Sequence, residues 1–334
     1  MSPTGLKPGE DNPVRSLLPM LPPAVRGSIR MLPAPVLDQV EEIRLRQGRP
    51  LILTLSAGDM FLNGEGSPVV DQSQAYRVSE DDMERLVQLI SASSIYALEE
   101  ELRNGFITLP GGYRAGICGK AVLEGGRVKT LKYLSACNIR IFREVAGAAG
   151  AVLPQLVDRK RSVICHTVLV SPPRCGKTTL LRDLVRQVSN GVPSLSLPGA
   201  NVGLVDERSE IAGCYLGVPQ RDVGLRTDVL DGCPKAEGMV MLLRAMGPQV
   251  IATDEIGRRE DIAAIEEVLN AGVKVLATVH GSSLKDLAGR PALEYLIQSR
   301  TIERYVILGR SRGVGTVEEI IDGKTLQPLG VKLC

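Results

Sequence analysis

The chain has no tryptophan, and aromatic residues make up only 3% of its 334 positions. Proteins that bind single-stranded nucleic acids commonly stack the bases on aromatic rings along a basic groove. Here 40 basic residues are nearly balanced by 38 acidic ones, the formal net charge is +2, and no block of like charge runs along the chain. The composition therefore argues against a nucleic-acid platform of this kind.

Pairs of cysteines with C-x-x-C spacing are absent as well. The seven cysteines are dispersed, at positions 118, 137, 165, 175, 214, 233 and 334. An odd, dispersed set in a cytosolic chain is typical of reduced thiols. We therefore expect neither a disulfide framework nor a zinc site.

The chain also has no apolar run long enough to cross a bilayer. Its longest weakly polar stretch, residues 145–157, is too short for this and contains Pro154. Residues 1–15 contain no apolar signal-peptide region. With 44% hydrophobic residues, the sequence predicts a globular protein of the cytoplasm that is long enough for two domains.

Prolines are concentrated in residues 1–35, which we expect to form a mobile tail with one short helix at 23–29. Residues 36–145 mix short strands and helices and predict a smaller α+β domain. Its expected strands and helices follow from apolar alternation, from the N-cap Ser79 and from glycine turns. The strands are 40–45, 51–55, 106–109, 113–122 and 138–144, and the helices are 80–92 and 96–104.

Residues 146–160 are rich in small side chains and are interpreted as a linker, either a hinge or the start of a helix packed on the next domain. From residue 161 to 334 the pattern changes to apolar strands between amphipathic helices, which indicates an α/β domain with a parallel sheet covered on both faces. Its expected strands are 163–170, 202–206, 250–254, 273–279, 305–308 and 317–321, and its helices begin at 177, 234 and 259.

A phosphate-binding loop is predicted between the first strand of this domain and its first helix. Gly176-Lys177-Thr178 matches the end of GxxxxGK(S/T), in which backbone N–H groups and a helix N-terminus face the phosphates. Lys177 would reach the β- and γ-phosphates, and the Thr178 hydroxyl would bind Mg²⁺. The expected nucleotide-binding residues are Ser171, Pro172, Pro173, Arg174, Cys175, Gly176, Lys177, Thr178 and Thr179.

Ser171 stands where the motif has its first glycine, so either the loop entry is shifted or that glycine is dispensable. The alternative to a phosphate-binding loop is an ordinary strand-to-helix turn. That alternative leaves Lys177 unexplained, because a cation at a helix N-terminus is unfavourable without an anion.

Acidic residues follow two other predicted strands. The strand 250–254 ends in Asp254-Glu255, where Asp254 is placed to hold Mg²⁺ and Glu255 to act as a general base on the attacking water. After the strand 202–206, Asp206 and Glu207, with Glu210, are placed to add to the metal shell or to water activation. The alternative for this second group is a solvated strand end.

The sequence has two histidines, and they occupy different positions in the pattern. His280 ends the strand 273–279, on the side of a parallel sheet where ligands bind, and we expect it to sense the γ-phosphate. Thr278 is placed to hydrogen-bond the water. His166 lies inside the first strand, and we interpret it as structural.

Phosphoryl transfer is often accelerated by an arginine that reaches in from a neighbouring subunit. Arg258 directly follows the DEIG turn and is a candidate, although a surface ion pair is the commoner role for any single arginine. The other arginines considered are Arg221, Arg226, Arg244 and Arg259.

Four stretches in this order resemble the boxes of the secretion-type ATPases, the RecA-like motors of type II and type IV secretion and of pili. They are the phosphate loop SPPRCGKTT, the acidic box VDERSE, the strand LLRAMGPQVIATDEIGRRED and the His box ATVHG. EEIRLRQGRPL, GGYRAGICGKAV and NIRIFRE are similar to that family's N-terminal domain. Within the superfamily, VDERSEIAG, GVPQRDVGLRTDVLDGCPKAEGM and ATDEIG resemble the stage III sporulation protein AA family, and the resemblance covers roughly residues 36–300.

The resemblance implies a RecA-like P-loop ATPase domain behind a smaller α+β domain, with ATP and Mg²⁺ as ligands. It implies a hexameric ring in which the first domain closes over a neighbour's nucleotide, and a membrane-anchored partner in a channel between mother cell and forespore. The protein would then lie in the mother-cell cytoplasm, peripheral to the outer forespore membrane. The implied roles are Lys177 on phosphates, Thr178 and Asp254 at Mg²⁺, Glu255 on water, Asp206 or Glu207 as second acid, and His280 as sensor.

Two other hypotheses remain open from the sequence. One is a P-loop ATPase that binds nucleic acid, since RecA-like sheets also drive strand translocases. The other is a nucleotide-dependent scaffold with little turnover, which the replacement of the motif glycine by Ser171 suggests.

Overall fold

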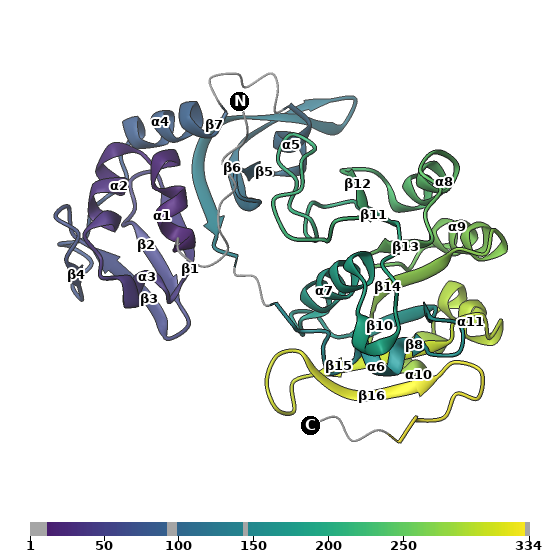
Figure 1. Ribbon diagram of the computed structural model, residues 1–334. Helices are drawn as coiled ribbons and strands as arrows, with labels where there is room; N and C mark the ends of the chain where they lie inside the picture. Colours follow the sequence, from purple (N-terminus) through teal and green to yellow (C-terminus); the bar gives the residue numbers. More distant parts are fainter. Residues whose placement is uncertain (1–11, 92–98, 143–145, 331–334) are drawn as a thin grey trace. The chain divides into compact units, whose positions relative to one another are not determined.

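The computed structural model describes residues 12–91, 99–142 and 146–330. The chain divides into two compact units, Met1–Arg143 and Glu144–Cys334, each with its own hydrophobic core. Both units contain a seven-stranded sheet, so the fold is a mixed α/β fold with two large sheets (Figure 1). In the described residues, no helix is long and apolar enough to cross a membrane.

The first unit is built on an antiparallel sheet with the strand order β4-β3-β2-β1-β7-β6-β5. Apolar side chains of its strands and helices form one core, in which Ile43, Leu53 and Leu86 are fully buried. Its strands are β1 (Val40–Arg46), β2 (Ile52–Leu55), β3 (Gly58–Leu62), β4 (Pro68–Val69), β5 (Phe106–Leu109), β6 (Tyr113–Glu124) and β7 (Arg127–Arg140). Its helices are α1 (Pro13–Leu17), η1 (Leu18–Met20), α2 (Pro23–Arg30), α3 (Ala34–Leu37), α4 (Glu80–Ile90) and α5 (Glu99–Asn104).

The helix expected at 23–29 is confirmed as α2, but further helices stand where a mobile tail was expected. Val14, Leu17, Leu21, Val25 and Ile29 recur every three or four residues, and all are fully buried in the core of the first unit. The prolines do not oppose these helices, because each helix carries its proline in the first turn, where no N–H is needed. Residues 1–11 of the expected tail lie outside the described residues.

The helix predicted after Ser79 is confirmed, and its N-terminus is capped as expected. The Ser79 hydroxyl accepts the Asp82 N–H at 3.1 Å, and the Asp82 carboxylate accepts the Ser79 N–H at 2.9 Å. Two differences occur nearby. Strand β3 was not predicted, and the last predicted strand is longer, as β7 pairs with β6 in one extended hairpin.

The second unit contains a sheet with the strand order β12-β11-β13-β14-β10-β15-β16, in which neighbouring strands are parallel except for the pair β15–β16. Every residue of β10, β11 and β13 is buried, as expected for central strands covered on both faces. The strands are β8 (Val157–Asp158), β9 (Val163–Ile164), β10 (Thr167–Ser171), β11 (Val202–Asp206), β12 (Thr227–Asp231), β13 (Val250–Thr253), β14 (Lys274–His280), β15 (Arg304–Gly309) and β16 (Thr316–Asp322).

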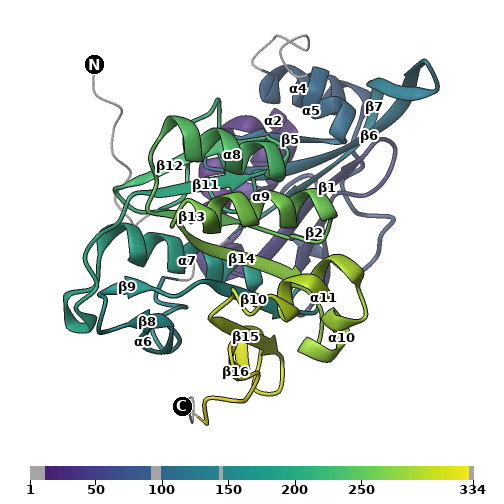
Figure 2. The ribbon, with the colours of Figure 1, turned by 90° about the vertical axis from the view of Figure 1, so that its right-hand side faces the viewer.

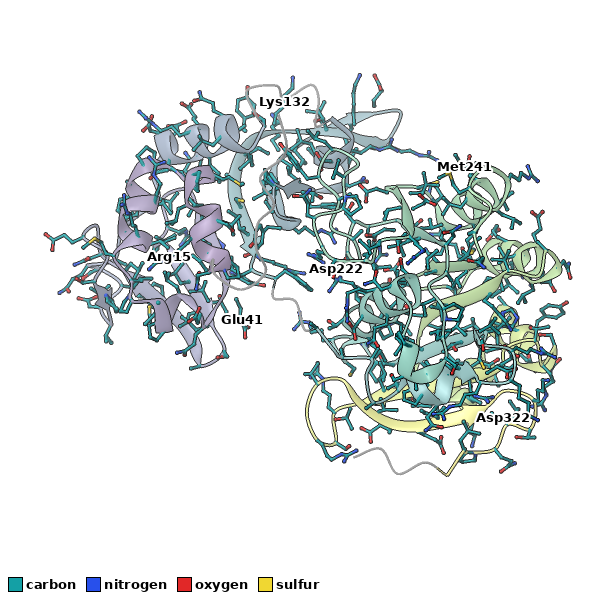
Figure 3. All side chains as sticks on the ribbon, viewed as in Figure 1. Arg15, Glu41, Lys132, Asp222, Met241 and Asp322 are labelled. Atoms are coloured by element: carbon teal, nitrogen blue, oxygen red, sulfur yellow. The ribbon has the colours of Figure 1, made fainter. Side chains whose placement is uncertain are left out.

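Helices cover both faces of this sheet (Figure 2). Helix α7 packs on one face, with Leu181 and Leu184 in a core shared with Leu204 of β11. Helices α8, α9 and α11 cover the other face, while outward side chains such as Met241 of α8 are exposed (Figure 3). The helices are α6 (Leu153–Leu156), α7 (Lys177–Asn190), η3 (Pro193–Leu195), α8 (Lys235–Ala245), α9 (Arg259–Asn270), α10 (Leu284–Ala288) and α11 (Pro291–Gln298).

Two strands of this unit differ from expectation, and the 146–160 stretch fits one of its two expected alternatives. The predicted strand 163–170 is divided into β9 and β10, and the edge strand β12 was not predicted. The small-residue stretch 146–160 packs into the second unit, because Ala149, Val152 and Leu153 are buried in its core and Asp183 of α7 accepts the Ala149 N–H at 2.7 Å.

Candidate nucleotide-binding site

The chemistry-bearing residues lie at one edge of the second sheet. Strands β11, β13, β14 and β10 are consecutive neighbours and parallel, so their carboxyl ends meet. These ends carry Asp206, Asp254 directly after β13, His280 and Ser171, and Ser171 pairs in register with His280. Ligands of open α/β sheets bind outside this edge. The fold therefore brings together residues that are far apart in the sequence.

Ser171 continues strand β10 and does not shift the entry of the loop. Its side chain is fully buried, and its hydroxyl donates to the Pro172 carbonyl oxygen at 2.8 Å. The left-handed positions of the loop come later, at Arg174 (φ 58°) and Gly176 (φ 83°). A glycine is thus not required at position 171, and the departure from the motif is explained by the backbone conformation.

The rest of the loop leads directly into helix α7. Gly176 is the residue before the helix, and Lys177, Thr178 and Thr179 form its first turn. Cys175 is buried, and its thiol donates toward the Pro173 carbonyl oxygen at 3.6 Å.

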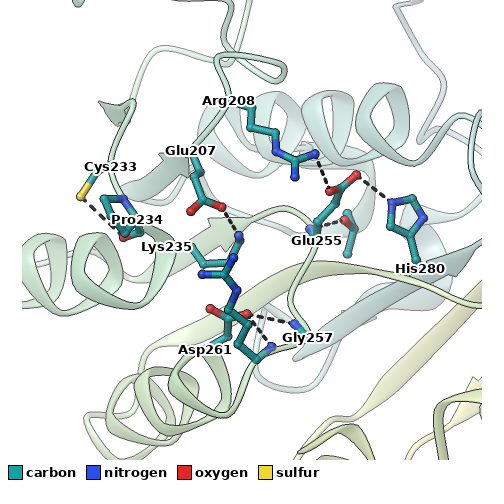
Figure 4. A network of polar contacts seen from close by, with 11 residues as sticks. Glu207, Arg208, Cys233, Pro234, Lys235, Glu255, Gly257, Asp261 and His280 are labelled. Atoms are coloured by element: carbon teal, nitrogen blue, oxygen red, sulfur yellow. Dashed lines mark hydrogen bonds and ion pairs between the residues drawn. The ribbon is translucent and has the colours of Figure 1, made fainter. Parts of the chain in front are cut away.

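A chain of polar contacts joins the loop to the end of β13. The Lys177 Nζ lies 3.0 Å from Nδ1 of His280, and Nε2 of His280 lies 2.8 Å from the carboxylate of Glu255. Arg208 donates to the other Glu255 oxygen at 3.0 Å (Figure 4). Residues from all four sequence boxes therefore share one hydrogen-bonded network.

The chemistry of these groups fixes the tautomer of His280. An ammonium group has donors and no acceptor, so Nδ1 must accept from Lys177. The ring proton then lies on Nε2 and is donated to Glu255. Burial lowers the pKa of the Lys177 ammonium, and the negative charge of Glu255 opposes this shift.

Thr278 holds the backbone of Glu255 in place. Its hydroxyl oxygen accepts the Glu255 N–H at 2.8 Å, and its side chain is fully buried. Glu255 itself has a left-handed backbone conformation, with φ of 47°, which is unfavourable for a residue with a side chain. The bond from Thr278 therefore helps to keep the carboxylate at the site edge.

Asp254 is buried next to three other acids. Burial and the charges of Asp206, Glu210 and Glu255 raise the pKa of its carboxyl to about 7. A divalent cation would relieve this repulsion, and oxygen donors are the ligands that Mg²⁺ prefers. The Thr253 hydroxyl beside it is buried without a hydrogen-bond partner among the described residues. The donor set at this edge thus fits Mg²⁺, with Asp254 and Thr178 as the residues that would hold it.

Asp206 has a different environment from the one expected for a catalytic acid. Its two carboxylate oxygens accept the N–H groups of Glu210, Ile211 and Ala212 at 2.7–2.9 Å, and its side chain is fully buried. Burial nevertheless raises the pKa of Asp206 above its ordinary value. Arg182 of α7 braces the same loop by donating to the carbonyl oxygens of Glu210 and Ile211. Asp206 therefore organises the loop that follows β11.

We expect Asp206→Ala to destabilise the second unit by about 3 kcal/mol, because three buried N–H groups lose their acceptor. Urea unfolding followed by circular dichroism measures the change. Asp206→Asn, which keeps one acceptor oxygen, should lose less stability, and Asp228→Ala, at an exposed position of β12, is the charge control. Wild-type stability combined with lost activity in Asp206→Ala would instead indicate a catalytic acid.

The remaining predicted residues lie beside this network. Glu207 forms an ion pair with Lys235 at the start of α8, and Arg258 precedes α9, where the carboxylate of Asp261 accepts its N–H at 2.9 Å. The Arg258 side chain is exposed. His166 is structural in its contacts, since its Nδ1 accepts the Val275 N–H at 3.3 Å and burial lowers its pKa to about 4.

Three cations beside the site, Arg182, Arg208 and Lys235, were not predicted from the sequence. Arg208 lies within VDERSE, in which roles were predicted for the acidic residues alone, and Lys235 lies in a later helix. Arg182 is one turn beyond the phosphate loop, on the same helix. Arg182 follows Thr178 by four residues, so both lie on one side of α7. This spacing was the only local feature of the sequence that could have pointed to Arg182.

A model of the family "Sporulation stage III, protein AA" matches residues 22–327. The chain belongs to the stage III sporulation protein AA family. Its relative in Bacillus subtilis (strain 168), stage III sporulation protein AA, is 41% identical over 318 residues, which cover 94% of this chain and 98% of that protein. The family match includes residues of both units and every residue of the candidate site.

Solved structures of secretion and pilus ATPases are similar to the chain. The ATPase DotB of Legionella pneumophila has 15% identity and a TM-score of 0.48, over 80% of this chain and 71% of that one. The pilus retraction motor PilT, solved with bound ADP, has 16% identity and a TM-score of 0.49, over 80% of this chain and 73% of that one.

Proposed function

We propose that the second unit is a RecA-like P-loop ATPase domain that binds ATP with Mg²⁺ and hydrolyses it to ADP and phosphate. The observation that carries this proposal is the network Lys177–His280–Glu255. It joins the lysine of a GKT loop to a carboxylate that follows a central parallel strand. These are the positions at which P-loop enzymes hold the phosphates and orient the attacking water.

Each residue has a distinct role in this proposal. Lys177 binds the β- and γ-phosphate oxygens, and Thr178 and Asp254 hold Mg²⁺, which neutralises charge on the phosphates. Glu255 takes the proton of the attacking water. His280 binds both Lys177 and Glu255, so it links the occupancy of the phosphate site to the position of the base. Arg208 donates to the same carboxylate and orients it.

In the cell, we propose that the ATPase powers or assembles a secretion-like channel between mother cell and forespore. It would act as a hexameric ring in the mother-cell cytoplasm, attached to the outer forespore membrane by a membrane-anchored partner. Arg258 is the arginine proposed to act on a neighbour's nucleotide, since its side chain is exposed beside the Glu255 turn. Membership of a sporulation family supports this setting.

A scaffold that binds ATP with little turnover is the second candidate function. Glu255 supports it, because both oxygens of its carboxylate already accept hydrogen bonds, from His280 and Arg208. A base held in this way must exchange one of these donors before it can accept a proton from water.

Measuring ATP turnover per subunit against protein concentration tests the proposal, with Glu255→Gln as the blank. A motor whose site is completed between subunits should show turnover that rises with concentration and then saturates. Turnover above the blank that stays flat across the range, down to concentrations at which sedimentation shows monomers, would contradict the ring. No turnover above the blank, with ATP binding intact, would favour the scaffold.

A further inference from the structure

The loop between β15 and β16, residues 310–315, lies against the phosphate loop. Arg310 Nη2 donates to the carbonyl oxygen of Arg174 at 2.6 Å. A second contact involves Gly176, where an added Cβ would lie only 3.2 Å from Cα of Gly315. Strand β15 is the neighbour of β10 on the side away from β14, so this loop flanks the phosphate loop opposite His280. No motif in the sequence indicated this contact.

The 310–315 loop is held from its own side, independently of the phosphate loop. The Ser311 N–H and hydroxyl donate to the Glu318 carboxylate at 3.1 and 2.8 Å. The Thr316 hydroxyl donates to the Gly313 carbonyl oxygen at 2.7 Å. These bonds to Ser311 also lower the pKa of Glu318. Arg310 is therefore presented to the phosphate loop by a preformed hairpin.

Arg174, whose carbonyl oxygen accepts the hydrogen bond from Arg310, has an unfavourable backbone conformation. Arg174 has φ of 58°, in the left-handed region that costs a residue with a Cβ roughly 1 kcal/mol. Left-handed residues are what allow successive N–H groups of a loop to face one anion. A hydrogen bond from a guanidinium to the carbonyl oxygen of that residue offsets the cost, since bonds that involve a charged group contribute about 1.5–3 kcal/mol.

We propose that Arg310 is a positioning residue for the phosphate loop, which keeps Arg174 in the left-handed conformation that binds phosphates. This inference rests on the proposed binding of ATP at that loop. Arg310 acts on the backbone of the loop and not on the nucleotide. Its contribution therefore depends on which residue occupies position 174, and this dependence can be measured.

The expected change in ATP affinity follows from the fraction of molecules in which Arg174 has the left-handed conformation. If the left-handed conformation is disfavoured about fivefold and the bond favours it about tenfold, removing the bond lowers that fraction roughly fivefold. Glycine adopts the left-handed conformation without this cost. In the Arg174→Gly background the same removal lowers the fraction only about twofold.

The test is a double-mutant cycle of Arg310→Ala and Arg174→Gly in the full chain, with the dissociation constant of a fluorescent ATP analogue as the readout. We expect Arg310→Ala to raise that constant about fivefold alone and about twofold in the Arg174→Gly background. The urea midpoint should stay near wild type, because Arg310 is exposed. Arg312→Ala, in the same loop, removes the same charge and should leave the affinity near wild type.

Two results would overturn the inference. If Arg310→Ala raises the dissociation constant by the same factor in both backgrounds, Arg310 acts on the phosphates themselves. If Arg312→Ala raises the dissociation constant as much as Arg310→Ala does, a positive charge anywhere in the loop is sufficient. A wild-type chain that binds no ATP analogue would instead contradict the proposed function. The two failures are therefore distinguishable in one set of titrations.

Discussion

Glu255→Gln is expected to reduce ATP turnover about 10²–10⁴-fold while ATP affinity stays within a few-fold of wild type. Glutamine keeps the shape of the side chain and can still accept from Arg208, but it cannot take a proton from water. Phosphate release at saturating Mg²⁺ and ATP measures the turnover, and titration with a fluorescent ATP analogue measures the affinity.

The matched control for this variant is Glu267→Gln, an exposed position on α9 in the same unit. It should behave as wild type. If Glu255→Gln hydrolyses ATP at the wild-type rate, Glu255 is not the base, and the proposed reaction must use another carboxylate of the edge.

Lys177→Met should weaken ATP binding roughly 10- to 100-fold and abolish turnover. The reason is that a charged hydrogen bond to phosphate is worth about 1.5–3 kcal/mol. Methionine has a similar length, so the packing of this buried side chain is largely kept. The same fluorescence titration gives the affinity, and Lys285→Met, at an exposed site in α10, controls for the loss of one positive charge.

For Lys177 the informative comparison is between ATP and ADP. The loss of binding affinity in Lys177→Met should be larger for ATP than for ADP, because Lys177 is proposed to bind the γ-phosphate as well as the β-phosphate. Affinity for ATP equal to that of wild type would remove Lys177 from the site and would leave its contact with His280 as a purely structural one.

The site residues that could be predicted from the sequence share one property: each is marked by a pattern of neighbouring residues in the chain. The GKT motif follows an apolar strand after a short loop, the Asp254-Glu255 pair follows one directly, and His280 ends one, and parallel strands place such residues at one edge. The sequence could not predict the order of strands in the second sheet or the contact between Lys177 and His280, because both depend on pairings between distant segments.

The N-terminal helices show how composition can mislead. The helix predicted at 23–29 is confirmed as α2, but the prolines on either side of it were taken to indicate a tail. Pro13 and Pro35 instead lie in the first turns of further helices, and the apolar spacing from Val14 to Ile29 fits one buried face. The role of Arg310 could not be predicted for another reason. Its partner is a backbone carbonyl far away in the chain, and side-chain chemistry alone gives no signal for such a contact.

Helix α7 is anchored by the side chains of two consecutive residues, Arg182 and Asp183. Arg182 grips the carbonyl oxygens of the loop after β11, and Asp183 accepts the N–H groups of Gly147 and Ala149, in the segment that continues toward the first unit. The phosphate lysine stands at the start of the same helix. Any tilt of α7 must therefore pull on both attachments at once. Because Lys177 and both attachments belong to one helix, a change in the tilt of α7 would act on the loop after β11 and on residues 147–149 together.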